Sequence, residues 1–214
     1  TNADLEFLNQ ELLLKPYIGI DTEFRRTSKD NMRLALLQIN DGEEIYIIDT
    51  TVIKNLKDEC SFLYSDSVIK IFHSCKEDIE AIYSWTGNLL VNIFDTQVAE
   101  ALLGGEYSIG YQALVEKKLG IRVDKGETRS NWLRRPLTDS QLKYAASDVE
   151  FLISVNAAYS APPVPLGSGW TQVITLVPRN RSISVWSNWL NRSTICGLMT
   201  TICGCVPGRY WQDI

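Results

Sequence analysis

The pattern of apolar and polar positions divides most of the chain into short strands followed by helices. Apolar runs separated by short polar connections predict three strands, Tyr17–Ile20, Leu34–Ile39 and Ile45–Ile48. Such short connections favour an antiparallel meander. After Asp49 the pattern changes to helical periods around a further strand, Val68–Phe72, and an amphipathic helix is predicted at Ala3–Leu14. The order predicts an α/β fold in which helices cover a mixed sheet.

A second helix is predicted from Thr138 onward. Thr138 and Gln141 have the spacing of a capping box, which marks a helix start. The apolar stripe expected on this helix consists of Leu142, Ala146, Val149 and Ile153. At 100° per residue, Tyr144 and Asp148 lie roughly 140° from the middle of that stripe. These two side chains are therefore not expected to be ordinary core residues.

Four carboxylates and one phenol have spacings that allow them to converge. In an extended strand, residues i and i+2 share a face, so Asp21 and Glu23 in Y-I-G-I-D-T-E-F project together. Asp78 follows the strand Val68–Phe72, near the start of a predicted helix. Tyr144 and Asp148 are four residues apart on the Thr138 helix and share one of its faces.

Such a set of acids has a specific chemistry. Hard divalent cations take oxygen ligands, and a pair of them can stabilise both the attacking and the leaving oxygen of a phosphoryl displacement. Four acids supply ligands for two ions, so the predicted cofactors are two divalent metal ions, Mg²⁺ or Mn²⁺. Taken singly, each motif is an ordinary solvated strand end, helix start or helix flank. The combination, in order and in secondary-structure context, is much more specific.

At this point the sequence resembles a known family, ribonuclease D and the wider group of 3′–5′ exonucleases named for four acids and a tyrosine. The resemblance runs from about Asp4 to Ile153. It is carried by D-T-E-F-R-R-T, L-A-L-L-Q-I, H-S-C-K-E-D-I-E, F-D-T-Q-V-A and E-T-R-S-N-W-L-R-R-P-L-T-D-S-Q-L-K-Y-A-A-S-D-V. None of the family's acids is missing, and the order of elements fits a ribonuclease H-like core.

The resemblance implies a role for each of these side chains. Asp21, Glu23 and Asp148 would hold the ion that carries the attacking water. Asp21 and Asp78 would serve the second ion, and Tyr144 would act on the water. A free tyrosine is a poor base near pH 7, so this phenol depends on the metal to lower the pKa of the water.

Two neighbours of the first acids are candidate nucleic-acid contacts. Thr22 and Phe24 flank the D-T-E acids, and the resemblance suggests that this segment lines the pocket for the terminal nucleotide. Phe24 has two open interpretations: it stacks on a base, which would be tolerant of sequence, or it is buried against the sheet.

The charge distribution limits the kind of nucleic-acid binding. A formal net charge of −5 argues against a protein that coats nucleic acid with a broad basic surface. Local clusters remain, and their alternatives are phosphate contacts or solvated loops. One cluster, on an expected long loop between the first two strands, is Arg25, Arg26, Lys29 and Arg33. The other, just before the Tyr144 helix, is Arg129, Arg134 and Arg135.

The remaining features favour structural roles. His73, the single histidine, is expected to be structural, and Asp95 is interpreted first as a helix N-cap. Five cysteines without a framework predict reduced thiols. Because the sequence shows no long apolar segment or signal peptide, a cytoplasmic protein with no membrane partner is expected.

The composition changes abruptly near the C-terminal end. All but one of the chain's 26 acidic residues precede Phe151. We therefore divide the chain into an exonuclease domain, residues 1–155, and an irregular tail of unclear origin, residues 156–214. Nothing in this atypical tail resembles a helical nucleic-acid-binding domain. A reading-frame shift near Asn156 would explain the change, and the alternative is a genuine Arg- and Trp-rich nucleic-acid-binding tail.

The sequence therefore predicts a two-metal-ion 3′–5′ exoribonuclease that releases nucleoside 5′-monophosphates. The acids argue for hydrolysis, whereas RNA 3′ ends as partners and a role in tRNA 3′ processing come only from the resemblance. No protein partner is implied. Two alternatives stay open: a DNA 3′–5′ exonuclease of the proofreading type, because nothing in the five residues reads a 2′-hydroxyl, and a non-catalytic RNA-binding module.

Overall fold

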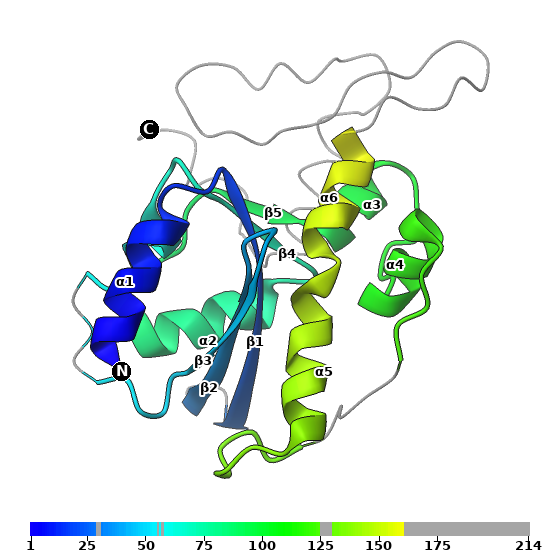
Figure 1. Cartoon of the computed structure of the whole chain (residues 1–214). Coiled ribbons are helices and arrows are strands. Elements are labelled where there is room, and N and C mark those ends of the chain that lie inside the picture. The colour runs from blue at the N-terminus through cyan, green and yellow to red at the C-terminus, as the bar shows by residue number, and fades with distance from the viewer. Residues whose placement is uncertain (29–30, 55, 57, 125–129, 161–214) are drawn as a thin grey trace. The chain divides into compact units, whose positions relative to one another are not determined.

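A computed structural model of the chain describes residues 1–28, 31–54, 56, 58–124 and 130–160, which form a five-stranded sheet flanked by helices (Figure 1). The strands are β1 (Tyr17–Ser28), β2 (Asn31–Asn40), β3 (Ile45–Asp49), β4 (Ile69–Phe72) and β5 (Ile93–Asp95). Their order is β3-β2-β1-β4-β5. β1, β2 and β3 pair antiparallel, while β4 pairs parallel with both β1 and β5. The predicted mixed sheet and the predicted meander are both confirmed.

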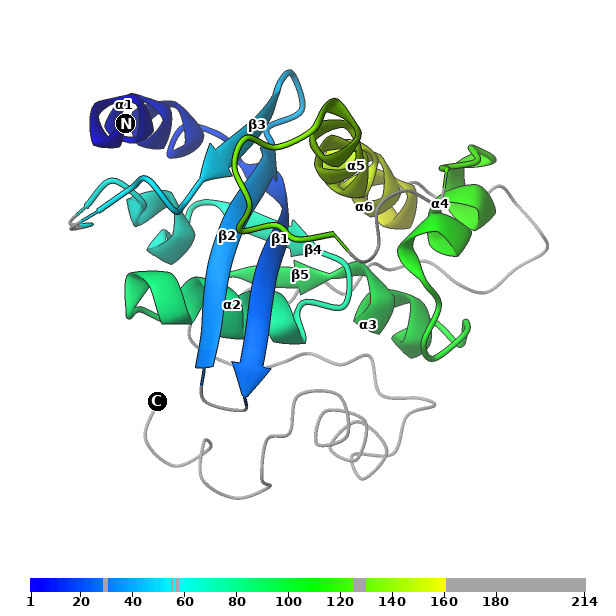
Figure 2. The ribbon, with the colours of Figure 1, turned by 90° about the horizontal axis from the view of Figure 1, so that it is seen from below.

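Helices cover both faces of this sheet. They are α1 (Asn2–Leu12), the 3-10 helix η1 (Ser61–Tyr64), α2 (Lys76–Thr86), α3 (Thr96–Leu102), α4 (Tyr111–Leu119), α5 (Asp139–Glu150) and α6 (Leu152–Ser160). The two views together place α1 and α2 on one side of the strands and α5 and α6 on the other (Figures 1 and 2). Within the part of the chain described here, none of these helices is long and apolar enough to cross a bilayer.

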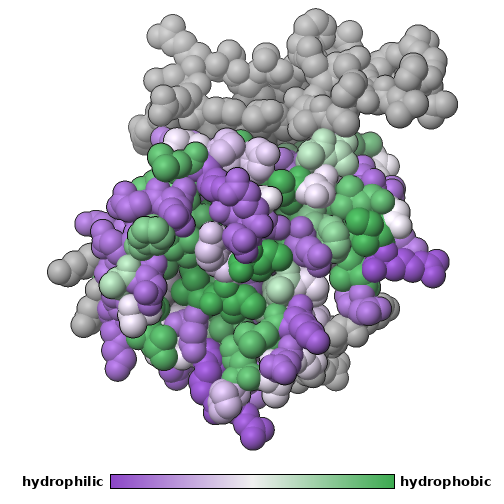
Figure 3. Space-filling model, in the orientation of Figure 1, coloured by the Kyte–Doolittle hydropathy of each residue, from purple (hydrophilic) through white to green (hydrophobic). Residues whose placement is uncertain are grey.

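The two faces of β1 explain this layering. Ile18 and Ile20 point into the larger core cluster, which also contains the predicted apolar face of α1 and residues of α2. That face of α1 is formed by Leu5, Leu8 and Leu12, all of which are buried. The opposite face of the sheet packs against α5 and α6 through smaller clusters around Ala145 and Leu152. On the side seen in Figure 3, apolar surface gathers in the middle of the molecule and polar side chains surround it.

The buried face of α5 differs from the predicted stripe. The buried residues are Gln141, Ala145 and Val149, whereas Leu142 is 38% exposed. Small Ala145 packs against the sheet beside Leu36, which allows the helix to lie close to the strands. The expected angle of 140° between the acidic face and the core was therefore wrong. Tyr144 and Asp148 each directly precede a buried residue and lie at the edge of the packed face.

The hairpin between the first two strands is longer than predicted. The expected long loop is absent from the described part of this region, because β1 continues to Ser28 and β2 begins at Asn31. Arg25, Arg26 and Arg33 are therefore strand residues. The hydrophobic pattern did not predict these polar ends of β1 and β2, because they extend beyond the apolar core. It also missed the short strand β5, and Lys29 lies outside the described residues.

Helix α6 crosses the domain boundary that was expected after residue 155. It runs to Ser160, and Val155 and Tyr159 are buried in a cluster with residues of α4. The Tyr159 hydroxyl donates to the backbone oxygen of Thr96 at 3.1 Å, so the start of the predicted tail is part of the packed fold. The rest of the predicted tail, residues 161–214, lies outside the described residues.

Two close contacts fix α5 and α6 against the strands. The side-chain amide of Asn40 donates to the backbone oxygens of Val149 and Glu150 at 3.1 and 3.0 Å, and thus satisfies carbonyls at the end of α5. Gly19 of β1 lies directly beneath the junction, where an added Cβ would be 3.0 Å from the Cβ of Leu152. A larger residue at this position would require Leu152 to move by a few tenths of an ångström.

We predict that Gly19→Ala destabilises the fold by about 1–3 kcal/mol, because a well-packed contact would have to open. Urea unfolding followed by circular dichroism measures the change. An exposed substitution on α1, Glu6→Ala, is the control and should stay within about 0.5 kcal/mol of the parent. An equally small effect of Gly19→Ala would contradict the close packing of the helix junction.

Candidate active site

Three of the predicted acids meet at one point of the fold. One carboxylate oxygen each from Asp21, Glu23 and Asp148 lie within 4.8 Å of one another. All three side chains are half-buried. Asp21 and Glu23 project from the same face of β1, and α5 brings Asp148 over that face. The two sequence spacings, i and i+2 on a strand and i and i+4 on a helix, thus produce a single acidic centre.

The fourth acid lies beside this centre. Asp78 is in the first turn of α2, is 7% exposed, and is not among the three acids whose oxygens converge. Its Oδ1 accepts a hydrogen bond of 2.5 Å from the hydroxyl of Thr22, the β1 residue between the two strand acids. The negative charge of Asp78 still contributes to raising the pKa of Asp21 and of Asp148.

Without a bound cation, the pKa of each of the four carboxyl groups is raised. Burial is the main cause, and it raises the pKa of Glu23 to about 8, of Asp148 to about 7 and of Asp78 to about 6. The pKa of Asp21 is raised well above its ordinary value by burial and by the charges of Asp78, Asp148 and Glu23. Such a set of oxygen donors fits a divalent cation, because a positive ion removes the repulsion that burial intensifies.

Tyr144 lies next to the acids, as its spacing from Asp148 predicts. Burial raises the pKa of its phenol further above the ordinary value, and the charges of Asp148 and Glu23 act in the same direction. The hydroxyl therefore stays protonated near neutral pH. Its ring packs against Trp132, with 6.0 Å between ring centroids.

Asp95 connects the start of α3 to the turn that precedes α2. It caps α3, as predicted, by accepting from the backbone N–H groups of Gln97 and Val98. The same carboxylate also accepts from the backbone N–H groups of Ser74 and Cys75, at 3.0 and 2.8 Å. These bonds fix the turn that begins α2 and so help to place Asp78. Sequence spacing revealed the cap but not this second contact.

Gln38 is a neighbour of the site that sequence reasoning passed over. It pairs in register with Asp21 across β1 and β2, and its side chain is fully buried. Among the described residues, neither polar atom of its amide has a hydrogen-bond partner. The sequence did contain a signal for this residue, because Gln38 is the one polar residue inside the apolar run Leu34–Ile39.

The predicted nucleic-acid contacts have different surroundings. Thr22 is 5% exposed, and its hydroxyl is engaged with Asp78 rather than with the surface. Phe24 is partly buried and packs against the larger core cluster, in line with the second interpretation of this residue. Arg129 lies outside the described residues.

Two of the expected phosphate contacts serve the fold instead. Arg26 forms ion pairs with Glu77 and Glu80 of α2. Arg135 donates to both carboxylate oxygens of Asp49 and to the backbone oxygen of Trp132, which anchors the loop before α5. Of the two alternatives left open for Arg135, a solvated loop does not describe it, and phosphate contact stays a prediction for a guanidinium that already has acceptors within the protein.

His73 has a structural environment, as expected. Its Nδ1 lies 2.9 Å from the hydroxyl of Thr96, and its Nε2 lies 2.9 Å from the backbone oxygen of Ile109. Burial lowers the pKa of the imidazole. The ring joins the end of β4 to α3 and to the segment before α4.

Comparisons with known proteins agree with this arrangement. A family model described as 3′-5′ exonuclease matches residues 1–158. The ribonuclease D of Pseudomonas paraeruginosa is 41% identical over 160 residues, which are 75% of this chain and 43% of that protein. The crystal structure of Escherichia coli RNase D, an exoribonuclease involved in structured RNA processing, matches with a TM-score of 0.70 and 36% identity, over 73% of this chain and 42% of that one.

A magnesium-bound structure of Brucella melitensis NrnC also matches, with a TM-score of 0.61 and 25% identity over 70% of this chain and 74% of that one. The chain belongs to the 3′-5′ exonuclease family, and the resemblance to ribonuclease D and the ribonuclease H-like fold are confirmed. It spans less than half the length of the curated ribonuclease D proteins that it matches.

We predict that Asp21→Asn stabilises the metal-free protein. The pKa of Asp21 is raised by folding, so this acid favours the folded state only below its unfolded pKa near 4, and that contribution is lost as the pH rises. At pH 8 in EDTA the variant should gain at least about 1 kcal/mol, the equivalent of one pKa unit. Mg²⁺ should raise the melting temperature of the parent more than that of the variant.

Thermal melts with EDTA and with Mg²⁺, at pH 5 and pH 8, measure both effects. Glu150→Gln removes one exposed negative charge from the same helix as Asp148 and is the matched control. The assignment of a cation site at Asp21 fails if Mg²⁺ stabilises Asp21→Asn as much as it stabilises the parent.

Proposed function

We propose that this chain is a metal-dependent 3′–5′ exoribonuclease that releases nucleoside 5′-monophosphates from RNA 3′ ends. The observation that carries the proposal is the convergence of Asp21, Glu23 and Asp148 oxygens within 4.8 Å, in a family of 3′-5′ exonucleases. Two divalent ions, Mg²⁺ or Mn²⁺, would supply charge neutralisation at the phosphodiester and a water of lowered pKa. The likeness to a magnesium-bound nuclease supports this choice of ion.

The acids divide into two overlapping ligand sets. Asp21, Glu23 and Asp148 would hold one ion, because their oxygens converge. Asp78, which lies beside the centre and interacts electrostatically with Asp21, would share the second ion with it. The Thr22 hydroxyl holds the Asp78 carboxylate in place, so one of its oxygens is oriented before any substrate arrives.

Tyr144 orients the attacking water. Its hydroxyl lies at the edge of the acidic centre and remains protonated, so it donates or accepts a hydrogen bond rather than removing a proton on its own. Packing against Trp132 fixes the ring. Precise orientation of a nucleophile is a large part of what such a site contributes to rate.

RNA enters this proposal from the ribonuclease D relatives. A role on tRNA precursors is proposed only from the resemblance of the sequence motifs to that family. The exoribonuclease in structured RNA processing that shares this fold supports the RNA assignment. A cytoplasmic location is part of the same proposal, and the thiol of Cys60, which forms no disulfide, suits a reducing compartment.

Digestion of matched RNA and DNA oligonucleotides, labelled at the 3′ or the 5′ end, tests the proposal. With Mg²⁺ or Mn²⁺ we expect mononucleotides to be released from RNA 3′ ends, and no release in EDTA. Asp21→Asn and Asp148→Asn should abolish turnover, because each loses a ligand. Glu150→Gln, with the same change of charge on α5, should retain it.

Each other outcome points to another function. Faster digestion of DNA than of RNA would favour the proofreading type of exonuclease. Binding of RNA without any metal-dependent cleavage, in a chain that melts cooperatively, would favour the non-catalytic binding module and overturn the proposal.

We predict that Tyr144→Phe lowers kcat by about 100-fold or more while leaving KM nearly unchanged, because the water loses its hydrogen bond but the substrate keeps its contacts. The phenyl ring preserves the packing against Trp132, so the melting temperature should not fall. Steady-state kinetics on an oligoribonucleotide measures the split. An equal change in kcat and KM would contradict a role on the water.

A further inference from the structure

An arginine pair lies on the same strand face as the catalytic acids. Along β1, Thr22 contacts Asp78 of α2, Phe24 packs into the α1/α2 core, and Arg26 pairs with two acids of α2. The alternate residues of this strand, Asp21, Glu23 and Arg25, point to the other face. Two residues of a strand span about 7 Å, so Arg25 begins about 7 Å along the sheet from Glu23.

The pairing register of this hairpin shifts twice, and neither shift alters that assignment. Glu23 pairs with Leu36 and Phe24 pairs with Leu34, so at the first shift the extra residue is in β2 and the alternation of β1 continues to Arg25. The second shift, between Arg26 and Ser28, lies beyond Arg25. Arg25 then pairs directly with Arg33 across the two strands. Like charges that face each other in this way destabilise a sheet.

The described residues leave these two charges uncompensated. Neither Arg25 nor Arg33 forms an ion pair with any residue that the structure describes, and both are exposed. Their neighbour Arg26, on the opposite face, has two acidic partners. An unfavourable, unneutralised pair next to a phosphodiester-cleaving site indicates that an anion supplies the missing charge.

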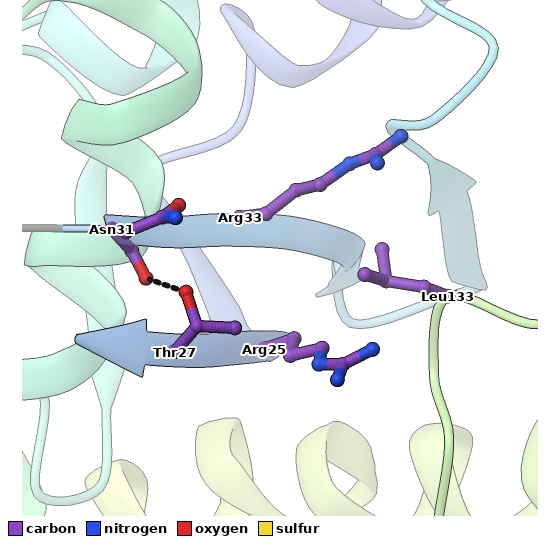
Figure 4. A pocket seen from close by; sticks show the side chains of 5 residues that line it. All are labelled: Arg25, Thr27, Asn31, Arg33 and Leu133. Atoms are coloured by element: carbon purple, nitrogen blue, oxygen red, sulfur yellow. Dashed lines mark hydrogen bonds between the residues drawn. The ribbon is translucent and has the colours of Figure 1, made fainter.

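A pocket surrounds this pair. Arg25, Thr27, Asn31, Arg33 and Leu133 line an open hollow of about 240 Å³. Figure 4 shows both guanidinium groups extending toward the side of the hairpin where Leu133 lies, and the Thr27 hydroxyl donating to the backbone oxygen of Asn31 at 3.4 Å. The hollow is smaller and more open than a typical small-molecule site, and suits a phosphate with part of its sugar.

The wall formed by Leu133 is held rigidly. Its neighbour Trp132 is 6% exposed, and Arg135 fixes the same loop to Asp49 and to the backbone oxygen of Ala35. The hollow therefore joins the β1–β2 hairpin to the loop that leads into α5, the helix that carries Tyr144 and Asp148. A ligand in it would lie between the two elements that build the acidic centre.

We propose that the Arg25–Arg33 pocket binds the backbone phosphate of a nucleotide on the 5′ side of the bond that is cut. This inference rests on the proposed function, because a strand whose 3′-terminal phosphodiester lies at Asp21 and Glu23 must continue away from them. Guanidinium groups bind phosphate oxygens in a bidentate manner, and Leu133 offers apolar surface to the adjoining sugar or base. Contacts of this kind are independent of sequence.

Fluorescence anisotropy with a 5′-labelled octaribonucleotide in EDTA, at several salt concentrations, tests the pocket without requiring catalysis. The variant Arg25→Gln/Arg33→Gln should bind about tenfold or more weakly, and the slope of log K against log salt should shrink by about 1 for each arginine that contacts a phosphate. Its melting temperature should not fall, since a repulsive pair is removed.

The matched control is Arg122→Gln/Lys54→Gln, which removes two positive charges from exposed positions away from the hairpin. Equal losses of affinity in the two double variants would assign the effect to net charge and overturn the proposal. Unchanged affinity and salt slope in Arg25→Gln/Arg33→Gln would overturn it as well.

A dinucleotide with a single phosphodiester and no 5′ phosphate separates this inference from the proposed function. It has no phosphate for the pocket, so the arginine variant should hydrolyse it with the same kcat/KM as the parent. A selective loss on the octaribonucleotide supports the pocket. If the parent hydrolyses neither the dinucleotide nor the octaribonucleotide, the exonuclease proposal is refuted. The anisotropy result then still decides whether the arginine pair binds a backbone phosphate.

Discussion

Mutual repulsion among half-buried carboxylates is the constraint on which the rest of this structure depends. Asp21, Glu23 and Asp148 bring oxygens within 4.8 Å of one another, and burial raises the pKa of each group. Left to themselves, such groups would move apart or stay protonated. The fold opposes this with contacts at both ends of α5, where Asn40 binds carbonyls at its C-terminus and Arg135 anchors the loop before its start. A cation bound between these carboxylates would neutralise their repulsion.

The single strand β1 organises both halves of the chemistry through its alternation. One face carries apolar residues into the core, together with Thr22, which orients Asp78. The other face carries Asp21, Glu23 and then Arg25, so negative and positive side chains follow each other along one line. In our proposals the acids hold metal ions at the bond that is cut, and the arginine pair holds the next part of the backbone. On these proposals, a chain with an overall charge of −5 would bind nucleic acid through a local arrangement of charges rather than through a broad basic surface.

Packing distance connects this chemistry to stability. Gly19 lets the α5–α6 junction approach β1, and small Ala145 lets α5 lie close to the sheet. Both positions determine how far Asp148 stands from the strand acids, although neither residue touches a substrate. Membership of the 3′-5′ exonuclease family places this geometry in a known class of enzymes.

The sequence alone determined the class of fold, the capping box at Thr138 and the convergent spacings of the acids, because these depend on local periodicity that a few residues specify. The tertiary structure decided what long-range contacts control. In the structure, the buried face of α5 does not include Leu142, and the hairpin that carries Arg25 and Arg33 is longer than predicted. The guanidinium of Arg135 binds Asp49. The tertiary structure also placed Gln38 and Asp95 around the site. None of these follows from local pattern, because each depends on which distant segment supplies the neighbouring surface.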